Sequence, residues 1–217
     1  MDKEMSLLLP LLKDASTVSL NGFEFHTGTV GKHSVVACKC GIGKVNAAVG
    51  TLTLIENFHP AMIVNTGVAG GTGATDDPAR VLDVVLASEI AYHDVWCGPG
   101  TEPGQAAGCP ARFSCPLPAG VRGALDVKEG LLASGDIFVD RPEDLGRILA
   151  LYPDAKAVDM ESAAIAHVCH LKSVPFVCIR VVSDTPGDGG NAAAYESFWL
   201  DAPARTFAEV EKLLHIL

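Results

Sequence analysis

Carboxylates follow two apolar runs in the last third of the chain. Asp159 and Glu161 come at the end of one run, and Ser183 and Asp184 come at the end of another, Pro175 to Val182. Runs of this kind predict buried strands, and the small apolar residues between them predict a helix that begins at Glu161. We interpret strand, helix and strand as one parallel crossover unit. Because open α/β sheets bind ligands outside the carboxyl ends of their strands, these polar side chains are expected to converge on a ligand.

Arg180 lies inside the second apolar run, where a buried guanidinium needs an anionic or ligand partner. Glu161 is its nearest candidate in the predicted unit. Each residue taken singly also has a purely structural explanation: the helix dipole favours an acid in the first turn, and Ser-Asp before Thr-Pro-Gly is ordinary turn chemistry. Their joint arrangement favours a ligand site.

Five segments give the chain a family resemblance. They are, in chain order, GIGKVNAA, NTGVAGG, SGDIFV, VDMESAAIAHVCH and VPFVCIRVVSD. Together they resemble the purine nucleoside phosphorylase superfamily, and within it the family of 5′-methylthioadenosine/S-adenosylhomocysteine nucleosidases. The resemblance covers nearly the whole chain. It implies a three-layer α/β/α sandwich with a central mixed twisted sheet, one nucleoside phosphorylase-like domain over residues 1–217, and no cofactor or metal.

The resemblance implies a reaction and two catalytic residues. The reaction is hydrolysis of the N-glycosidic bond of methylthioadenosine and S-adenosylhomocysteine, with release of adenine from an oxocarbenium-like ribose. Asp184 would donate a proton to adenine N7, which requires a pKa raised by burial near other acids, and Ser183 would orient it. Glu4 matches the general base of the family and would activate the attacking water.

Substrate contacts are also implied. Phe138 would stack on the base; the less favoured alternative is an aromatic that packs in the core under a turn. The backbone of Val139 would read the Watson-Crick edge of the base. Glu161 would accept hydrogen bonds from the ribose hydroxyls, with Met160 under the sugar and Arg180 holding the carboxylate. Further contacts are implied for Ile42, Val68, Ala69 and Gly70, and for Ile42 a tight strand-to-helix turn is an equal alternative.

A glycine-rich turn is predicted after an apolar strand at Ala61 to Thr66. In phosphorylases of this superfamily, as the resemblance implies, the corresponding turn carries an arginine and a hydroxyl residue that bind phosphate. Asn65 and Val68 stand in those places and can neutralise no phosphate charge. Water is therefore the predicted nucleophile.

Composition limits the partners and the compartment. The chain has 217 residues, 48% of them hydrophobic, and a formal net charge of −10, which argues against nucleic-acid or anionic membrane surfaces. No apolar stretch reaches the roughly 18 residues of a membrane span, and acids near the start do not suit a signal peptide, so we expect a cytoplasmic protein. Seven cysteines without a CxxC pair indicate reduced thiols. For His93-Asp94 and for His167 with His170, local bonding or packing is favoured over metal binding.

The remaining elements follow from periodicity and turn residues. The expected elements are a helix to Pro10, a hairpin of 23–30 and 34–40 joined at Gly31-Lys32, a helix after GIGK, strands at 84–92 and 128–134, and helices at 142–151 and 203–217. In the family a strand precedes the first helix, and this strand is missing from the sequence. An irregular surface loop is expected at 97–118. Its first part has no aromatic residue, which leaves Trp96 as the substitute for the family's 5′-pocket aromatics.

The resemblance also implies a homodimer, because nucleosidases of this superfamily pair through helices and loops that complete each other's 5′ pocket. The apolar helix after Gly43 offers a surface for such pairing. Three other functions stay open: a nucleosidase for another purine nucleoside of the futalosine type, a purine nucleoside phosphorylase, and a non-catalytic relative that binds nucleosides.

Overall fold

The computed structural model describes residues 2–117, 120–121, 123–187, 189–201 and 203–217. The first half of the chain forms α1 (Asp2–Leu8), a 3-10 turn (Leu9–Leu11), β1 (Lys13–Leu20), β2 (Phe23–Val30), β3 (His33–Cys38), α2 (Lys44–Phe58), β4 (Ile63–Gly71) and β5 (Val84–Tyr92). The second half forms β6 (Phe113–Ser114), β7 (Lys128–Ser134), α3 (Pro142–Leu151), β8 (Ala155–Asp159), α4 (Ser162–Lys172), β9 (Phe176–Asp184), α5 (Asn191–Asp201) and α6 (Pro203–Ile216).

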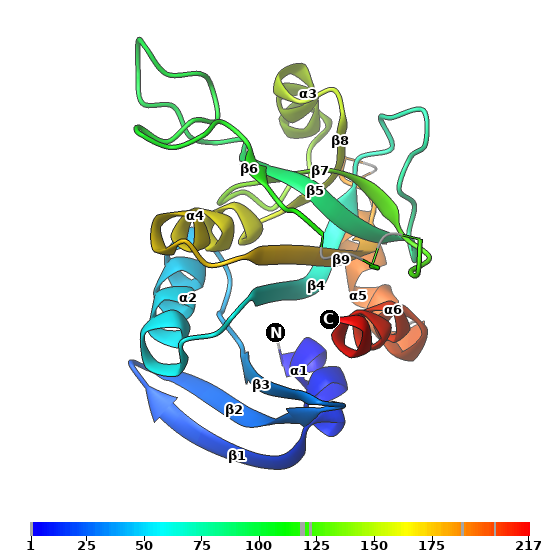
Figure 1. The fold of residues 1–217 in the computed structure, drawn as a ribbon. Helices are drawn as coiled ribbons and strands as arrows, with labels where there is room; N and C mark the ends of the chain where they lie inside the picture. Colours follow the sequence, from blue (N-terminus) through cyan, green and yellow to red (C-terminus); the bar gives the residue numbers. More distant parts are fainter. Residues whose placement is uncertain (1, 118–119, 122, 188, 202) are drawn as a thin grey trace.

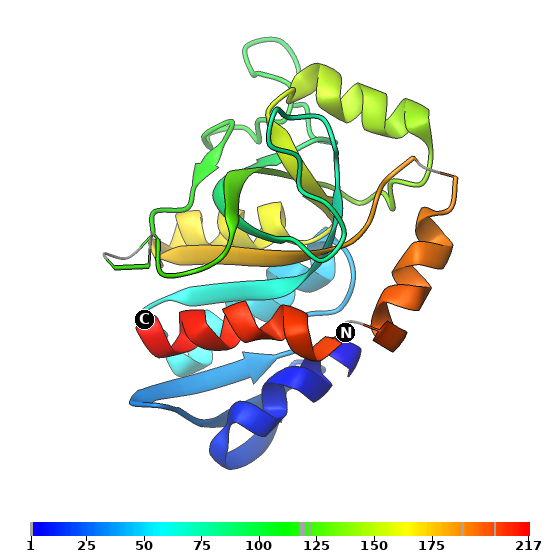
Figure 2. The same cartoon turned by 90° about the vertical axis from the view of Figure 1, so that its right-hand side faces the viewer.

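A mixed sheet in the order β6-β5-β7-β8-β4-β9 forms the centre, and β5 also pairs with β9, so that the sheet curls toward a barrel (Figure 1). Helix α4 packs against β4, β5 and β9 on one side, where α2 packs on α4. Helices α5 and α6 pack against β9 on the other side, beside α1 (Figure 2). All nine residues of β9 are buried, as expected for a near-continuous apolar run covered on both faces. The predicted mixed sheet between helical layers is confirmed.

The predicted parallel crossover from β8 through α4 to β9 is wrong. Strand β8 pairs with β7 and β4, whereas β9 pairs with β4 and β5. Strand β4 lies between them and runs antiparallel to β8 but parallel to β9. An apolar run identifies a buried strand but carries no information on its neighbours, and so the sequence could not supply this order.

The segment NTGVAGG lies inside strand β4 and not in a turn after it. Gly67 pairs with Arg180 of β9, and Gly70 pairs with Asp184. A Cβ atom at Gly67 would lie 2.7 Å from Glu4 Oε1 and would overlap the guanidinium of Arg180. Glycine is needed at this position because charged side chains occupy the space beside the strand.

The N-terminal strands form a separate antiparallel sheet, β1-β2-β3. The predicted hairpin of β2 and β3 is confirmed, with Val30 paired to His33 around Gly31. Strand β1 was missed because it is polar and mostly exposed. Asn21 and Gly22, with φ of 51° and 82°, form the turn that joins it to β2, and this Asn-Gly pair is a strong hairpin signal. The first element described is α1, so the strand that precedes it in the family is not among these elements.

The expected surface loop at 97–118 is only partly a surface loop. Its second part forms the short strand β6, which pairs with β5, and Cys109, Phe113 and Cys115 are buried. Within the described residues, every helix is too short or too polar to cross a membrane.

Candidate active site

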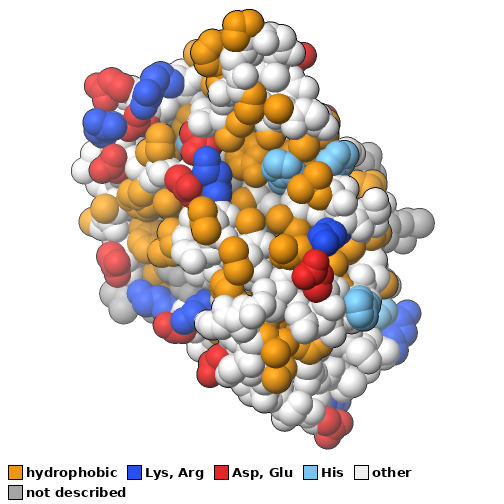
Figure 3. All heavy atoms as spheres, turned by 90° about the vertical axis from the view of Figure 1, so that its left-hand side faces the viewer, with side chains coloured by type: hydrophobic (Ala, Val, Ile, Leu, Met, Phe, Trp, Pro, Cys, Tyr) orange, Lys and Arg blue, Asp and Glu red, His pale blue; other side chains and the backbone are white. Residues whose placement is uncertain are grey.

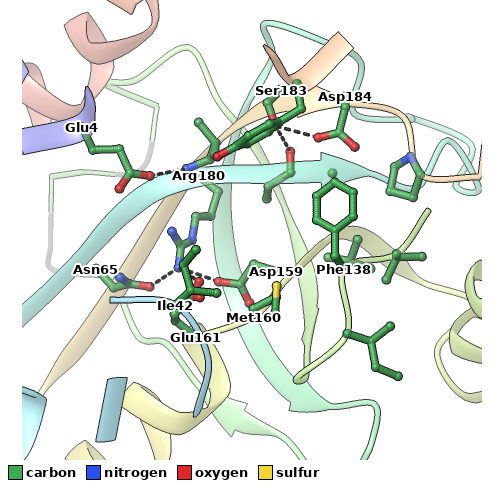
Figure 4. Close-up of a pocket in the computed structure, with 18 of the residues that line it drawn as sticks. Glu4, Ile42, Asn65, Phe138, Asp159, Met160, Glu161, Arg180, Ser183 and Asp184 are labelled. Carbon is green, nitrogen blue, oxygen red and sulfur yellow. Dashed lines mark hydrogen bonds and ion pairs between the residues drawn. The ribbon is translucent and has the colours of Figure 1, made fainter. Parts of the chain in front are cut away.

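One pocket of about 260 Å³ gathers side chains from α1, β4, β8, β9 and α5, together with the segments that follow β3 and β7 (Figure 4). All twelve residues expected to bind or convert a ligand line it. They are Glu4, Ile42, Val68, Ala69, Gly70, Phe138, Val139, Met160, Glu161, Arg180, Ser183 and Asp184. The fold thus brings together residues that lie as far apart in the sequence as Glu4 and Asp184.

Asp184 and Ser183 are the last two residues of β9, and both are buried. Ser183 Oγ donates a hydrogen bond of 2.7 Å to Asp184 Oδ1. This bond fixes the plane of the carboxyl group, and a proton on a neutral Asp184 would then be carried by Oδ2. The pair therefore has the geometry of an acid held by an orienting hydroxyl group.

Arg180 lies in the middle of a buried polar network and is 4% exposed. Its Nη2 atom is 2.5 Å from Asp159 Oδ2 and 2.8 Å from Asn65 Oδ1. Ser162 Oγ donates to the same Asn65 oxygen at 2.8 Å. Although burial opposes the charged form, the Asp159 carboxylate and other negative neighbours raise the pKa of Arg180, and the guanidinium stays charged.

The expectation that Glu161 is the nearest partner of Arg180 is wrong. Glu161 Oε2 is 3.9 Å from Nη2, whereas Asp159 is at 2.5 Å. Asp159 is the last residue of β8 and turns into the sheet, but Glu161 lies two residues on as the N-cap of α4. Asp159 therefore neutralises the arginine and leaves Glu161 facing the pocket.

Glu161 is a largely buried carboxylate between the Arg180 guanidinium and the Gly43 backbone N–H. Its Oε1 atom accepts a hydrogen bond of 2.9 Å from the Gly43 backbone N–H, at the N-terminus of α2. Burial raises the pKa of Glu161 and the negative charge of Asp159 raises it further, whereas Arg180 and the Gly43 N–H act in the opposite direction. When ionised, this carboxylate can accept hydrogen bonds from neighbouring hydroxyl groups.

Glu4 connects helix α1 to the wall of the pocket. Its Oε1 atom accepts a hydrogen bond of 3.3 Å from the Val68 backbone N–H in β4. The side chain is half-buried and points toward Arg180, across the pocket from Phe138 (Figure 4). This contact holds Glu4 against the sheet even though it lies close to the end of the described chain.

Two aromatic side chains form the apolar wall of the pocket. Phe138 is 45% exposed and lines the pocket, so it is not the core aromatic of the alternative interpretation. Tyr195 of α5 stands edge-on to it at a centroid distance of 6.2 Å. Sequence reasoning missed Tyr195, although the spacing of Tyr195, Phe198 and Trp199 predicts one face of a helix. Trp96, expected near the substrate, is 64% exposed and lies outside the described lining.

The charge of the pocket is mostly negative. Glu4, Asp159, Glu161 and Asp184 line it, and Arg180 is the one basic side chain among its described lining residues. Arg180 is already bound to Asp159 and Asn65. Neither Asn65 nor Val68 offers a cation: the Asn65 oxygen faces Arg180, and the Val68 N–H faces Glu4. The arrangement favours a neutral or cationic ligand over an anion.

The histidines considered as metal ligands are engaged in other contacts or packed in the fold. His167 lies 3.1 Å from Cys109 Sγ and 3.3 Å from the Tyr92 hydroxyl. His93 is packed against Gly135, and its neighbour Asp94 binds Lys44. In the part of the chain that the structure describes, no group of three or more His, Cys, Asp or Glu side chains is placed to hold a metal ion.

The same fold occurs in proteins of known family. The family model of the phosphorylase superfamily matches residues 1–215. The chain therefore belongs to the phosphorylase superfamily. The 5′-methylthioadenosine/S-adenosylhomocysteine nucleosidase of Neisseria meningitidis, solved with methylthio-immucillin-A, is 36% identical, with a TM-score of 0.90 over 100% of this chain and 96% of that one.

Two further similar structures are nucleosidases of the same kind. The Streptococcus pneumoniae enzyme, solved with a transition-state inhibitor, is 32% identical, with a TM-score of 0.92 over 100% of this chain and 96% of that one. The S-adenosylhomocysteine nucleosidase of Streptococcus pyogenes is 32% identical, with a TM-score of 0.90 over 100% and 94%. The resemblance found in the sequence motifs is thereby confirmed.

Proposed function

We propose that this protein hydrolyses the N-glycosidic bond of 5′-methylthioadenosine and S-adenosylhomocysteine, and releases adenine and the thio-ribose. The observation that carries the proposal is the charge of the pocket: its arginine is already paired with Asp159, and Glu4 and Glu161 add two carboxylates to that pair. Such a pocket stabilises a ribose that becomes cationic in the transition state and repels a phosphate dianion. Similar structures that hold methylthioadenosine analogues or adenine support the substrate class.

In this proposal Asp184 is the general acid. The bond between ribose and adenine breaks slowly because the departing base takes up negative charge, and a proton placed on N7 removes that charge. Asp184 is buried and its carboxyl group is held by Ser183, which suits a side chain that carries a proton to one atom of the base. Phe138 stacks on adenine, and the backbone of Val139 contacts its edge.

Glu161 and Glu4 act on the sugar and on water. Glu161 accepts hydrogen bonds from the ribose 2′- and 3′-hydroxyls, with Met160 under the ring. Glu4, which is anchored by the Val68 N–H, takes a proton from the water whose oxygen forms the new bond to C1′. One proton thus leaves water for Glu4 and another leaves Asp184 for adenine, and the C1′–N9 bond is replaced by a C1′–O bond.

The direct test is adenine release from methylthioadenosine by the purified protein, with phosphate absent and then present. We expect release without phosphate and an unchanged rate when phosphate is added. Release that depends on phosphate would replace the proposal with a phosphorylase, and nucleoside binding without release would replace it with a binding protein.

We also propose that the protein forms a homodimer. Exposed apolar side chains lie in the turn after β3 and in the first turns of α2. Ile42, Val45 and Val49 are 58%, 73% and 43% exposed. The face formed by α2 and α4 shows apolar atoms gathered between charged groups (Figure 3). Since Ile42 also lines the pocket, a second copy on this face would complete the wall of the site.

The location that we propose is the cytoplasm. Seven cysteines are free, and Cys178 and Cys169 are buried thiols whose pKa is raised by burial to about 11 and about 12. Thiols that stay unpaired are typical of a reducing compartment.

The continuous match over residues 1–215 supports one domain for the chain.

A further inference from the structure

Three residues outside the pocket form a closed ring of polar contacts. Lys44 Nζ lies 2.8 Å from Asp94 Oδ2, and the same Asp94 oxygen accepts a 2.8 Å hydrogen bond from the Asp136 N–H. Asp136 Oδ1 in turn accepts a 2.7 Å hydrogen bond from the Lys44 N–H. Asp94 follows β5, Asp136 follows β7, and Lys44 is the first residue of α2, so the ring joins three separate elements.

The ring fixes the turn that carries Gly43. Gly43 has a φ of 90°, which favours glycine, and a Cβ atom there would lie 3.0 Å from Asp136 Oδ1. Its N–H donates to Glu161 Oε1 at 2.9 Å, and no closer partner of that carboxylate is found among the described contacts, since Arg180 is 3.9 Å away. The direction of this N–H is therefore what orients Glu161.

We propose that Lys44, Asp94 and Asp136 are positioning residues for Glu161: they hold the Gly43 N–H against its carboxylate and so set its orientation toward the ribose. The inference rests on the proposed function, in which Glu161 binds the ribose hydroxyls. None of the three residues lines the pocket. Their effect passes through Glu161, and it should alter the binding of the sugar and leave the binding of the base unchanged.

The charge and burial of the ring suit this role. The side chains of Lys44 and Asp94 are 25% and 16% exposed, so their ion pair is shielded more than a surface pair. Exposed ion pairs contribute little to stability. The pair Lys172–Glu56, with side chains 40% and 55% exposed, has the same 2.8 Å separation but joins the far ends of α4 and α2, and it gives a matched control.

The experiment compares two ligands by calorimetry: a non-cleavable methylthioadenosine analogue, which has a ribose, and adenine, which has none. The variants are Lys44→Met, Asp136→Ala, Asp136→Asn and the control Lys172→Met. We expect Lys44→Met and Asp136→Ala to weaken binding of the analogue about tenfold and to change adenine binding by less than about twofold, the scale of one hydrogen bond to a charged group. Asp136→Asn keeps the acceptor oxygen and should bind like wild type, as should Lys172→Met.

The possible outcomes distinguish a failure of the proposed role of the ring from a failure of the proposed function. Wild-type protein that hydrolyses methylthioadenosine, with analogue binding unchanged in Lys44→Met, would overturn the role of the ring alone. An equal loss of analogue and adenine binding would also overturn it, because a general structural defect does not discriminate between the two. Wild-type protein that binds neither ligand would overturn the proposed function and the inference that rests on it. The melting temperature of each variant identifies one that fails to fold. Lys44→Met and Asp136→Ala remove two different contacts of the same ring, so each variant tests its role independently.

Discussion

At the scale of single residues, Asp184 is the clearest test of the chemistry. Asp184→Asn keeps the size of the side chain and can still accept the Ser183 hydrogen bond, but it has no acidic proton to give. We expect kcat to fall by at least about a hundredfold, the usual scale for loss of a general acid, with binding of a nucleoside analogue largely retained. Adenine release and calorimetry measure the two quantities. Near-normal turnover in this variant would remove Asp184 from the mechanism.

Glu161 predicts how substrate binding depends on pH. Its burial, together with the charge of Asp159, raises its pKa above the ordinary value of 4.5, so the carboxylate takes up a proton at a higher pH than an exposed glutamate. The protonated group is a poorer acceptor for ribose hydroxyls. KM for methylthioadenosine should therefore rise as the pH falls through this raised pKa and stay constant above it. Glu161→Gln should have a high KM with no such dependence; a dependence that survives in this variant would assign it to another group.

Most of the pocket residues could be predicted from the sequence motifs, because the segments that resemble the family also contain the residues that line the pocket. The partner of Arg180 could not be predicted. Asp159 and Glu161 are two residues apart, and only the strand geometry decides which of them turns toward the arginine. Ser162, which joins Asn65 to this network, has no signal in the sequence beyond a hydroxyl group at the start of a helix.

At the scale of elements, the turn before β5 contains a strained residue. Leu82 has a φ of 78°, a region that costs a residue with a side chain about 1 to 2 kcal/mol, and it is 49% exposed. Leu82→Gly removes this strain and keeps the backbone hydrogen bond from the Leu82 N–H to the Val182 carbonyl. Glycine also raises the entropy of the unfolded chain, which lowers the free energy of unfolding by about 0.5 to 1 kcal/mol and offsets part of the gain. We expect a net gain of about 0.5 to 1 kcal/mol, seen as a melting temperature higher by about 1 to 4 °C.

The matched control is Leu82→Ala, which shortens the side chain but keeps Cβ. It should give no gain, because the strain arises at Cβ. Equal melting temperatures for the glycine and alanine variants would show that the backbone at this position is not strained.

Strands could be predicted where burial on both faces produces an apolar run, as in β5 and β9. The polar strand β1 gives no such run, because its face is exposed, and the turn Asn21-Gly22 was its one clear signal. The order of the strands depends on contacts between distant segments. Periodicity within one segment says nothing about these contacts, and the crossover prediction failed for that reason.

At the scale of the whole molecule, the exposed apolar start of α2 predicts self-association. Val45 is 73% exposed, so Val45→Asp should not disturb the core, but it would bury a charge in an interface on this face. We expect wild type to sediment as a dimer at micromolar concentration and Val45→Asp as a monomer. The monomer should have a higher KM, because Ile42, which lies just before the same helix, lines the pocket. A wild-type monomer would contradict the proposed dimer.

The central claim is that water, and not phosphate, attacks the sugar. Arg180 is paired with Asp159, while Glu4 and Glu161 also line the pocket, and this charge disfavours a phosphate dianion. The most direct measurement is the mass of the sugar product formed from methylthioadenosine in ¹⁸O-labelled water that contains phosphate. We predict a free thio-ribose that carries one labelled oxygen at C1′. A sugar 1-phosphate without label at that oxygen would contradict the account.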